Sequence, residues 1–523
     1  MSVPSAIDNT WAPRLREELV WAQAQGDKGG ALWDPVVNRR VNLGVISRAL
    51  VLGLDGTRGL ADVISAVADA HPDRPRALIE HTFRTLMLMN LVEGSGKAIL
   101  ERVFAVRMGR VPFPTLVLEG SRFGCQGSGE CCQNYTFGPL SDEDAARLES
   151  LDLATHFPNV KPPYIVTVER EGHEPVRNLA SVNDRCVFLS EERLCGLHRV
   201  FGAESKPHFC RLFPLQPLPT IDGLKLYDRG ECASFATSAR DGQLILDQAP
   251  AIADLMPKSF DLLHPIVLVD DETPCDYGHF LALQRVMVAL VEARIGTAAE
   301  TLAALGRLMG RFLSTLRACP LLRGEPDASL GALLALPPSA FYEPPSSITA
   351  DDWDTLSCVA RDLLKLVGPS VRHEVAALLP VLTTRLSSEF GAAIHLIQAL
   401  AALRSRGEPL PDEYRRVVEL PCDPALLEDV LRLSYRQRLF GHQALIDERP
   451  LPALLRLAFV HLITALGARL RARIEGAPAV EERHLSFAHM LALRVMRREG
   501  AGQVLAAYQP DTFTLLDAAS QLL

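Results

Sequence analysis

Apolar positions recur every three to four residues over much of the chain, and this spacing predicts amphipathic helices. Near the N-terminus it predicts helices over 41–53, 60–70 and 74–91, with a hairpin-like turn at 92–96. After residue 260 nearly all of the sequence is helical in pattern. The expected helices there are 280–295, 298–316, 350–366, 372–386, 392–405, 425–439, 451–474, 482–498 and 511–522.

Residues 111–250 have a different pattern. Pro, Gly and Cys become frequent, and only short β-like runs remain, at 115–119, 164–169 and 224–227. So few regular elements bury little apolar surface, and a domain of this kind needs another source of stability. Bonds between a metal ion and thiolates can supply it.

Length and composition agree with several globular domains. The chain has 523 residues, and a single hydrophobic core stops growing at roughly 250–300 residues. The net charge of −9 argues against a nucleic-acid-binding protein, which needs a basic face. No secretory signal pattern is present, and the most apolar stretch, from Leu451, is interrupted by Arg456 and His461. We therefore expect a cytoplasmic protein that does not enter a membrane.

Seven of the eleven cysteines lie within one fifth of the chain. In a reducing cytosol, clustered thiols indicate metal ligands or redox groups rather than structural disulfides. The candidate metal ligands are Cys125, Cys131, Cys132, Cys186, Cys195, Cys210 and Cys232. The other four cysteines are scattered singly, and we expect them to be small buried core residues.

The candidates form three ordered motifs and one outlying thiol, Cys232. The first motif, FGCQGSGECC at 123–132, is rich in glycine, which lets backbone N–H groups turn toward thiolates. The second, CVFLSEERLC at 186–195, predicts a strand, a turn and a returning strand. In the third, KPHFCRLFP, Lys206 and Arg211 would compensate the negative charge of the thiolates.

These motifs resemble the YkgJ-type cysteine-cluster family, which includes the flagellin lysine N-methylases. The shared pattern is F-x-C…G-x-C-C, then C-x-F-L…C, then a basic residue and Pro before C-R-x-F-P. The resemblance implies bound zinc or iron and, for the methylase branch, a [4Fe–4S] cluster and S-adenosylmethionine. Many members have a cysteine where this chain has Ser128. The seven remaining thiols still exceed the four that one zinc ion or one Fe–S cube requires.

The residues themselves leave three kinds of chemistry open at this site. They are an iron–sulfur cluster with a functional role, a closed tetrahedral zinc with a purely structural role, and thiol–disulfide redox chemistry. His198 or His208 could replace a thiolate, although each is more often a hydrogen-bonding neighbour. No motif identifies a catalytic residue, since C-x3-C-x2-C, G-x4-G-K-[ST], H-E-x-x-H and G-x-S-x-G are all missing from the sequence.

The string ALVLGLDGTRGLADVISAVA at 49–68, with a third helix ending in MLMNLVEG, resembles the winged-helix fold of peptide-binding recognition elements. The pyrroloquinoline-quinone peptide chaperone is the type case of that fold. The resemblance implies that this part holds a precursor peptide for a partner enzyme. Many winged helices share this degenerate pattern, and the alternative is a plain helical scaffold.

Together these observations predict a mainly α-helical protein of three parts. We expect an N-terminal winged-helix-like module at 1–110, a small irregular α+β metal-binding domain at 111–250, and an all-helical domain at 251–523. The predicted activity is modification of a peptide or protein, most directly methyl transfer from S-adenosylmethionine to lysine. The alternative is a non-enzymatic protein whose structural zinc supports an interaction platform. The substrate, the catalytic residues and the oligomeric state do not follow from the sequence.

Two smaller predictions concern helix ends. Ser141, followed by three acidic residues, is typical of a helix N-terminus. His484 and His489 lie on one predicted helix, and we expect them at the surface or in a cap.

Overall fold

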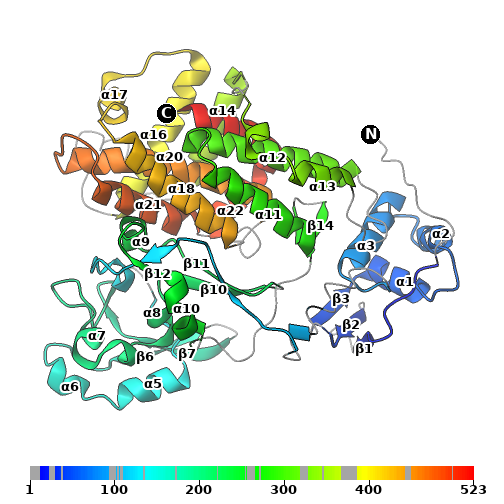
Figure 1. Cartoon of the computed structure of the whole chain (residues 1–523), viewed down its shortest axis with the longest axis horizontal. Coiled ribbons are helices and arrows are strands. Elements are labelled where there is room, and N and C mark those ends of the chain that lie inside the picture. The colour runs from blue at the N-terminus through cyan, green and yellow to red at the C-terminus, as the bar shows by residue number, and fades with distance from the viewer. Residues whose placement is uncertain are drawn as a thin grey trace.

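A computed structural model gives the arrangement of the chain, and Figure 1 shows it as a cartoon. The N-terminal elements, the cysteine-rich elements and the helical remainder form three groups in that view. The structure describes residues 12–22, 30–36, 39–93, 102, 105–106, 110–133, 136–170, 173–220, 222–253, 255, 266–269, 273–318, 328–343, 347–366, 386–441, 449–497 and 499–522.

The N-terminal group is a small sheet followed by three helices. The antiparallel sheet has the order β1 (Val20–Ala22), β2 (Gly30–Asp34), β3 (Arg39–Leu43). The helices are α1 (Val45–Gly53), α2 (Leu60–Ala70) and α3 (Arg76–Leu88). They enclose a core of their own, in which Leu32, Leu50, Ile64 and Phe83 are buried.

The prediction for this part was correct for α2 and α3 and wrong at the start of α1. Residues 41–43 belong to β3, where Val41 and Leu43 are buried and Asn42 is exposed, an alternation with the period of a strand. The sheet thus precedes the helices. In the described residues after α3, Val92 forms an isolated antiparallel bridge with Leu15 rather than part of a hairpin, which does not support the winged-helix prediction. Residues 94–96 of the predicted turn lie outside the described residues.

The cysteine-rich group consists of short elements, as predicted. One three-stranded sheet has the order β10 (Leu215–Pro219), β11 (Leu224–Asp228), β4 (Thr115–Val117), with β11 and β4 parallel. Two-stranded pairs are formed by β5 (Arg122–Phe123) with β12 (Gln243–Leu244), β6 (Ile165–Arg170) with β7 (His173–Leu179), and β8 (Ser181–Val182) with β9 (Arg185–Cys186). The helical pieces are α5 (Asp142–Glu149), α6 (Leu153–His156), α7 (Gly196–Phe201), α8 (His208–Leu212), α9 (Ala233–Thr237), α10 (Ile245–Ala253) and the 3-10 turns η1 (Glu130–Cys132) and η2 (Ala203–Ser205).

Two separate apolar cores hold these short elements together. One gathers Phe137, Leu148 and Phe188, and the other gathers Leu226 and Phe235. The predicted start of α5 is confirmed, because the Ser141 hydroxyl accepts a hydrogen bond of 3.0 Å from the backbone N–H of Asp144. The described residues of the cysteine-rich group therefore form two small cores rather than one large core.

The remainder is helical and shares one large core. A strand pair, β13 (Ile266–Leu268) and β14 (Pro274–Asp276), precedes it. Its helices are α11 (Tyr277–Glu292), α12 (Ala298–Ala318), α13 (Ala328–Leu334), α14 (Ala350–Lys365), α16 (Leu386–Arg406), α17 (Asp412–Val418), α18 (Pro424–Phe440), α20 (Pro450–Ile474), α21 (Glu482–Met496), α22 (Glu499–Ala507) and α23 (Thr512–Leu522), with η3 (Pro338–Phe341) and η4 (Gln509–Asp511). The predicted helix over 372–386 lies outside the described residues except at its last position.

Helix α20 is the centre of this group and contacts α12, α16, α21 and α23. Buried residues lie on all of its sides, Arg456 and His461 among them, as expected of a helix surrounded by protein. Of the described helices, it alone is long and apolar enough to cross a membrane, and 89% of its most apolar window is buried inside the protein. Such burial is typical of the core helix that the sequence predicted.

Candidate metal centre

All seven predicted ligands line a single cavity of about 570 Å³. Phe188 of one small core and Phe123, packed against the other, also line it. The cavity therefore lies where the two small cores of the cysteine-rich group meet. The cysteines come from six places in the fold: the loop after β5 (Cys125), η1 (Cys131 and Cys132), the end of β9 (Cys186), the residue before α7 (Cys195), α8 (Cys210) and the residue before α9 (Cys232).

The glycine-rich loop depends on left-handed backbone at two positions. Gly127 and Gly129 have φ angles of 68° and 69°, which side chains other than glycine rarely adopt. A Cβ at Gly129 would also lie 2.8 Å from the Cβ of Arg193. The loop carrying Cys125 is thereby packed against the turn between Cys186 and Cys195, which brings the first two motifs together.

The second motif was predicted only in part. Cys186 ends a strand, and Leu189 pairs with Cys195 in an isolated antiparallel bridge. The predicted returning strand is wrong, because α7 begins at Gly196 immediately after that bridge. A Cβ at Gly196 would lie 2.6 Å from the Phe157 ring. Glycine at this position therefore lets the start of α7 pack closely against Phe157.

The distance between two of the thiols fits a shared metal ion. Cys131 Sγ and Cys132 Sγ are 3.8 Å apart. Two thiolates on one tetrahedral zinc, each ~2.3 Å from the metal, are about 3.8 Å from each other. Among the described residues, no three Cys, His, Asp or Glu side chains converge closely enough to hold an ion. The donor set is chemically suited to zinc or iron, and its members share one cavity.

Burial and neighbouring charges give these thiols different pKa values. The hydrogen bond with Cys132 is the main cause that lowers the pKa of Cys131 to about 7, and the charges of Lys206 and Arg494 lower it further. The same contact, with burial, raises the pKa of Cys132. Burial raises the pKa of Cys186 and of Cys232 to about 12, and raises that of Cys210. Of these five thiols, Cys131 is the one most readily deprotonated near neutral pH, and a metal must displace protons from the buried ones.

Both basic residues of the third motif line the cavity. Lys206 lowers the pKa of Cys131 and opposes the effect of burial on Cys210, which agrees with its predicted role. Arg211 instead forms an ion pair of 2.5 Å with Glu204. The charge that compensates the thiolates therefore comes mainly from Lys206.

The two candidate histidines differ in position. His198 lines the cavity. His208 does not, because its Nε2 is 2.6 Å from the carbonyl oxygen of Leu255 and its backbone N–H donates to Asp144 Oδ2. Ser128 also lines the cavity, and its hydroxyl accepts a hydrogen bond of 3.4 Å from the N–H of Glu130. The residue that replaces a cysteine thus remains beside the other thiols.

Three arginines that the sequence motifs did not indicate hold the loops of this site. Arg438 on α18, Arg494 on α21 and Arg497 donate to the backbone or carboxylates of residues 130 and 228–231. They are up to 364 positions from their partners along the chain. No local pattern marks them, so only the fold could reveal them.

Comparison with known families agrees with this geometry. Residues 124–235 match the family model CxxCxxCC, which describes a candidate zinc- or iron-chelating domain. The pattern of that name corresponds to Cys125, Ser128, Cys131 and Cys132, with serine at its second position. The match supports metal binding by the cysteine-rich region. The curated proteins and the solved structures gave no match.

Proposed function

We propose that the protein binds zinc or iron through the cysteines of the cavity, with space left beside the metal for a second molecule. The observation that carries this proposal is that all seven thiols line one cavity of about 570 Å³. Ligand-binding pockets usually have volumes of ~300–1,000 Å³. A zinc ion or an Fe–S cube needs only four thiolates, so the site has more donors than either requires.

The resemblance to lysine N-methylases extends the proposal to an enzyme. In this reading, the metal centre lies beside bound S-adenosylmethionine, and the substrate is a peptide or protein that presents a lysine. The space in the cavity and the order of the motifs support it. The test is calorimetric titration of the metal-loaded protein with S-adenosylmethionine, followed by incubation with labelled donor and lysine peptides. Lack of donor binding would contradict the enzymatic reading and leave metal binding intact.

A second candidate is a closed structural zinc that supports an interaction platform. The observation in its favour is the 3.8 Å separation of Cys131 Sγ and Cys132 Sγ. That distance suits two ligands of one ion, whereas in an Fe–S cube each cysteine binds a different iron. This candidate predicts a colourless protein with one zinc, stable in air.

Isolation of the protein under anaerobic conditions decides between the two metals. Elemental analysis and the visible absorption spectrum would be measured on the same sample. Iron with a brown chromophore that oxygen bleaches supports the cluster, and zinc without colour supports the structural site. A chain that contains neither metal, after growth with both supplied, contradicts the proposed function.

A further inference from the structure

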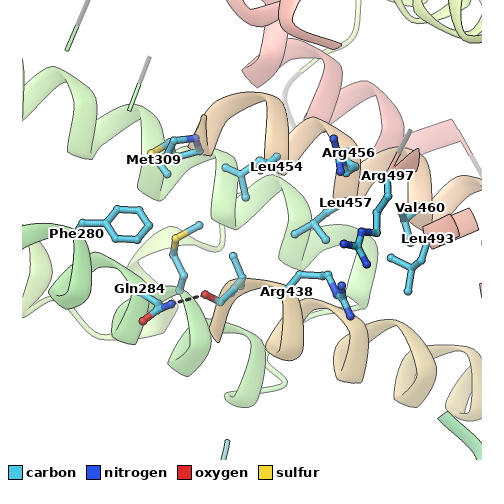
Figure 2. A pocket seen from close by; sticks show the side chains of 14 residues that line it. Phe280, Gln284, Met309, Arg438, Leu454, Arg456, Leu457, Val460, Leu493 and Arg497 are labelled. Carbon is cyan, nitrogen blue, oxygen red and sulfur yellow. Dashed lines mark hydrogen bonds between the residues drawn. The ribbon is translucent and has the colours of Figure 1, made fainter. Parts of the chain in front are cut away.

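The segment immediately before Cys232 is held by the helical group. Arg438 of α18 donates to Asp228 Oδ2 at 3.1 Å and to the carbonyl oxygen of Arg229 at 3.1 Å. Arg497 donates to the same carbonyl at 3.1 Å and to Glu231 Oε1 at 2.8 Å. Figure 2 shows the side chains of Arg438 and Arg497 directed toward each other at one end of a small apolar pocket. The loop therefore rests on two arginines that the helices fix in place.

Arg494 differs from these two because it contacts two cysteine loops at once. Its Nη2 donates to the carbonyl oxygen of Glu130 at 2.9 Å and to that of Glu231 at 3.2 Å. Glu130 directly precedes Cys131, and Glu231 directly precedes Cys232. One guanidinium thus ties together the backbones that carry the second and the seventh candidate ligands.

The element that carries Arg494 is well anchored. Helix α21 packs on α9, which begins directly after Cys232, and on α20 at the centre of the helical core. Leu485 and Leu493 of α21 are buried. A side chain on so firmly packed a helix can fix the separation of two loops that are irregular themselves.

We propose that Arg494 is a positioning residue of the metal centre, which sets the spacing between the Cys131–Cys132 turn and Cys232 and couples metal binding to docking of the helical group. The inference rests on the proposed function, since it requires that these cysteines hold a metal. It assigns to α21 a role that lies outside the matched residues 124–235.

The coupling acts in both directions. If docking of α21 favours the spacing that the metal needs, then bound metal favours docking of α21 by the same free energy. Metal loading should therefore protect α21, which contributes no residue to the cavity lining, as well as α9 and the cysteine loops. If Arg494 only stabilised the fold, its loss would not change how strongly the metal protects α9 and α21.

The experiment compares four full-length proteins: wild type, Arg494→Ala, Arg494→Lys and Arg483→Ala. Arg483 is the matched control, because it lies on the same helix and forms ion pairs of 2.7 Å with Glu475 and Glu481 at the surface. Zinc affinity is measured by competition with a chromophoric chelator, and amide hydrogen exchange of α9 and α21 is measured with and without zinc. Circular dichroism confirms that each metal-free variant is folded.

Loss of a residue that orients metal ligands typically lowers metal affinity ~10–100-fold, and we expect that for Arg494→Ala. Arg494→Lys should retain part of the affinity because it keeps the charge, and Arg483→Ala should bind as wild type does. Zinc should slow amide hydrogen exchange in α9 and α21 of the wild type. The slowing should be smaller in Arg494→Ala. If Arg494→Ala does not fold, Arg494→Lys provides the same two readouts.

Wild-type affinity in both Arg494 variants, or equal zinc-dependent protection in all four proteins, would overturn the inference and leave the proposed function standing. A wild-type chain that binds neither zinc nor iron would overturn both. The two failures are distinguishable, because only the second is visible in the wild type itself.

Discussion

The helical group and the cysteine-rich group differ in what holds each together. The helical group buries a continuous apolar core from Val269 to Leu522, with α20 surrounded on all sides. The cysteine-rich group has two small cores that meet at a cavity lined with thiols. Apolar burial stabilises the first group in proportion to the area removed from water. The second group buries less, and metal–thiolate bonds can supply what is missing.

The largest expected effect is in the helical core and should not depend on metal. Phe459 of α20 is fully buried, and Phe459→Ala should lower the free energy of unfolding by ~3–5 kcal/mol, because it removes apolar contacts and leaves a cavity. Denaturant unfolding with and without zinc measures the change. The affinity of the folded variant for zinc should equal that of wild type. A loss of zinc affinity in the folded variant would show that this substitution in the helical core also disturbs the metal centre.

The next largest effect is expected on metal affinity when thiols of the cavity are removed. Cys132→Ser and Cys210→Ser should each lower metal affinity by about 100-fold or more, since they remove a donor rather than a residue that supports one. Cys358→Ser is the control, because that thiol lies on α14 away from the cavity. Elemental analysis after dialysis measures the retained metal. Full metal content in both cavity variants would mean that the ligand assignment is wrong.

Metal affinity should also rise with pH. In the metal-free protein, Cys186 and Cys232 have pKa values of about 12 and carry protons near neutrality, whereas metal-bound thiolates carry none. Acid therefore favours the metal-free form, and affinity should increase about tenfold per pH unit for each displaced proton. Chelator competition at two pH values, one unit apart across neutrality, measures this slope. A slope of zero would indicate that neither buried thiol binds the metal.

The smallest expected effect tests the contact between the two groups. Gly230 has a φ of +82°, and a Cβ there would lie 2.8 Å from Arg438 Nη2 and from Leu493 Cδ1. Gly120, with φ +70° and open space around it, is the matched control for backbone strain alone. Gly230→Ala should destabilise the protein by about 1 kcal/mol more than Gly120→Ala, because it also crowds the interface. Equal thermal unfolding of the two variants would argue against close docking there.

The sequence predicted best what depends on neighbours along the chain. Helical periodicity identified α12, α14, α18 and α20 closely, and Ser141 marked the start of α5. The cysteine motifs identified six of the seven thiols that line the cavity, because their spacing and glycines are local features, and the outlying Cys232 was included with them. The brief apolar runs at 115–119, 164–169 and 224–227 also marked β4, β6 and β11, whereas β7 and β10 were not predicted.

Features set by distant contacts were missed. Val41 and Leu43 continue an apolar run into α1, so only pairing with β2 shows that they form a strand. His484 and His489 were expected at the surface or in a cap. His484 does accept the N–H of Glu481 in a cap, but both histidines are buried, because α21 packs between α20 and α9. Arg494 has no local signal at all, since its partners belong to loops far away in the sequence.

The most direct test of the central claim is the X-ray absorption fine structure of the metal-loaded protein at the zinc or iron edge. Coordination by the cavity thiols predicts a first shell dominated by sulfur, at about 2.3 Å for zinc, and a loss of sulfur in Cys132→Ser. A first shell of nitrogen and oxygen alone would show that the metal is held elsewhere and would contradict the account.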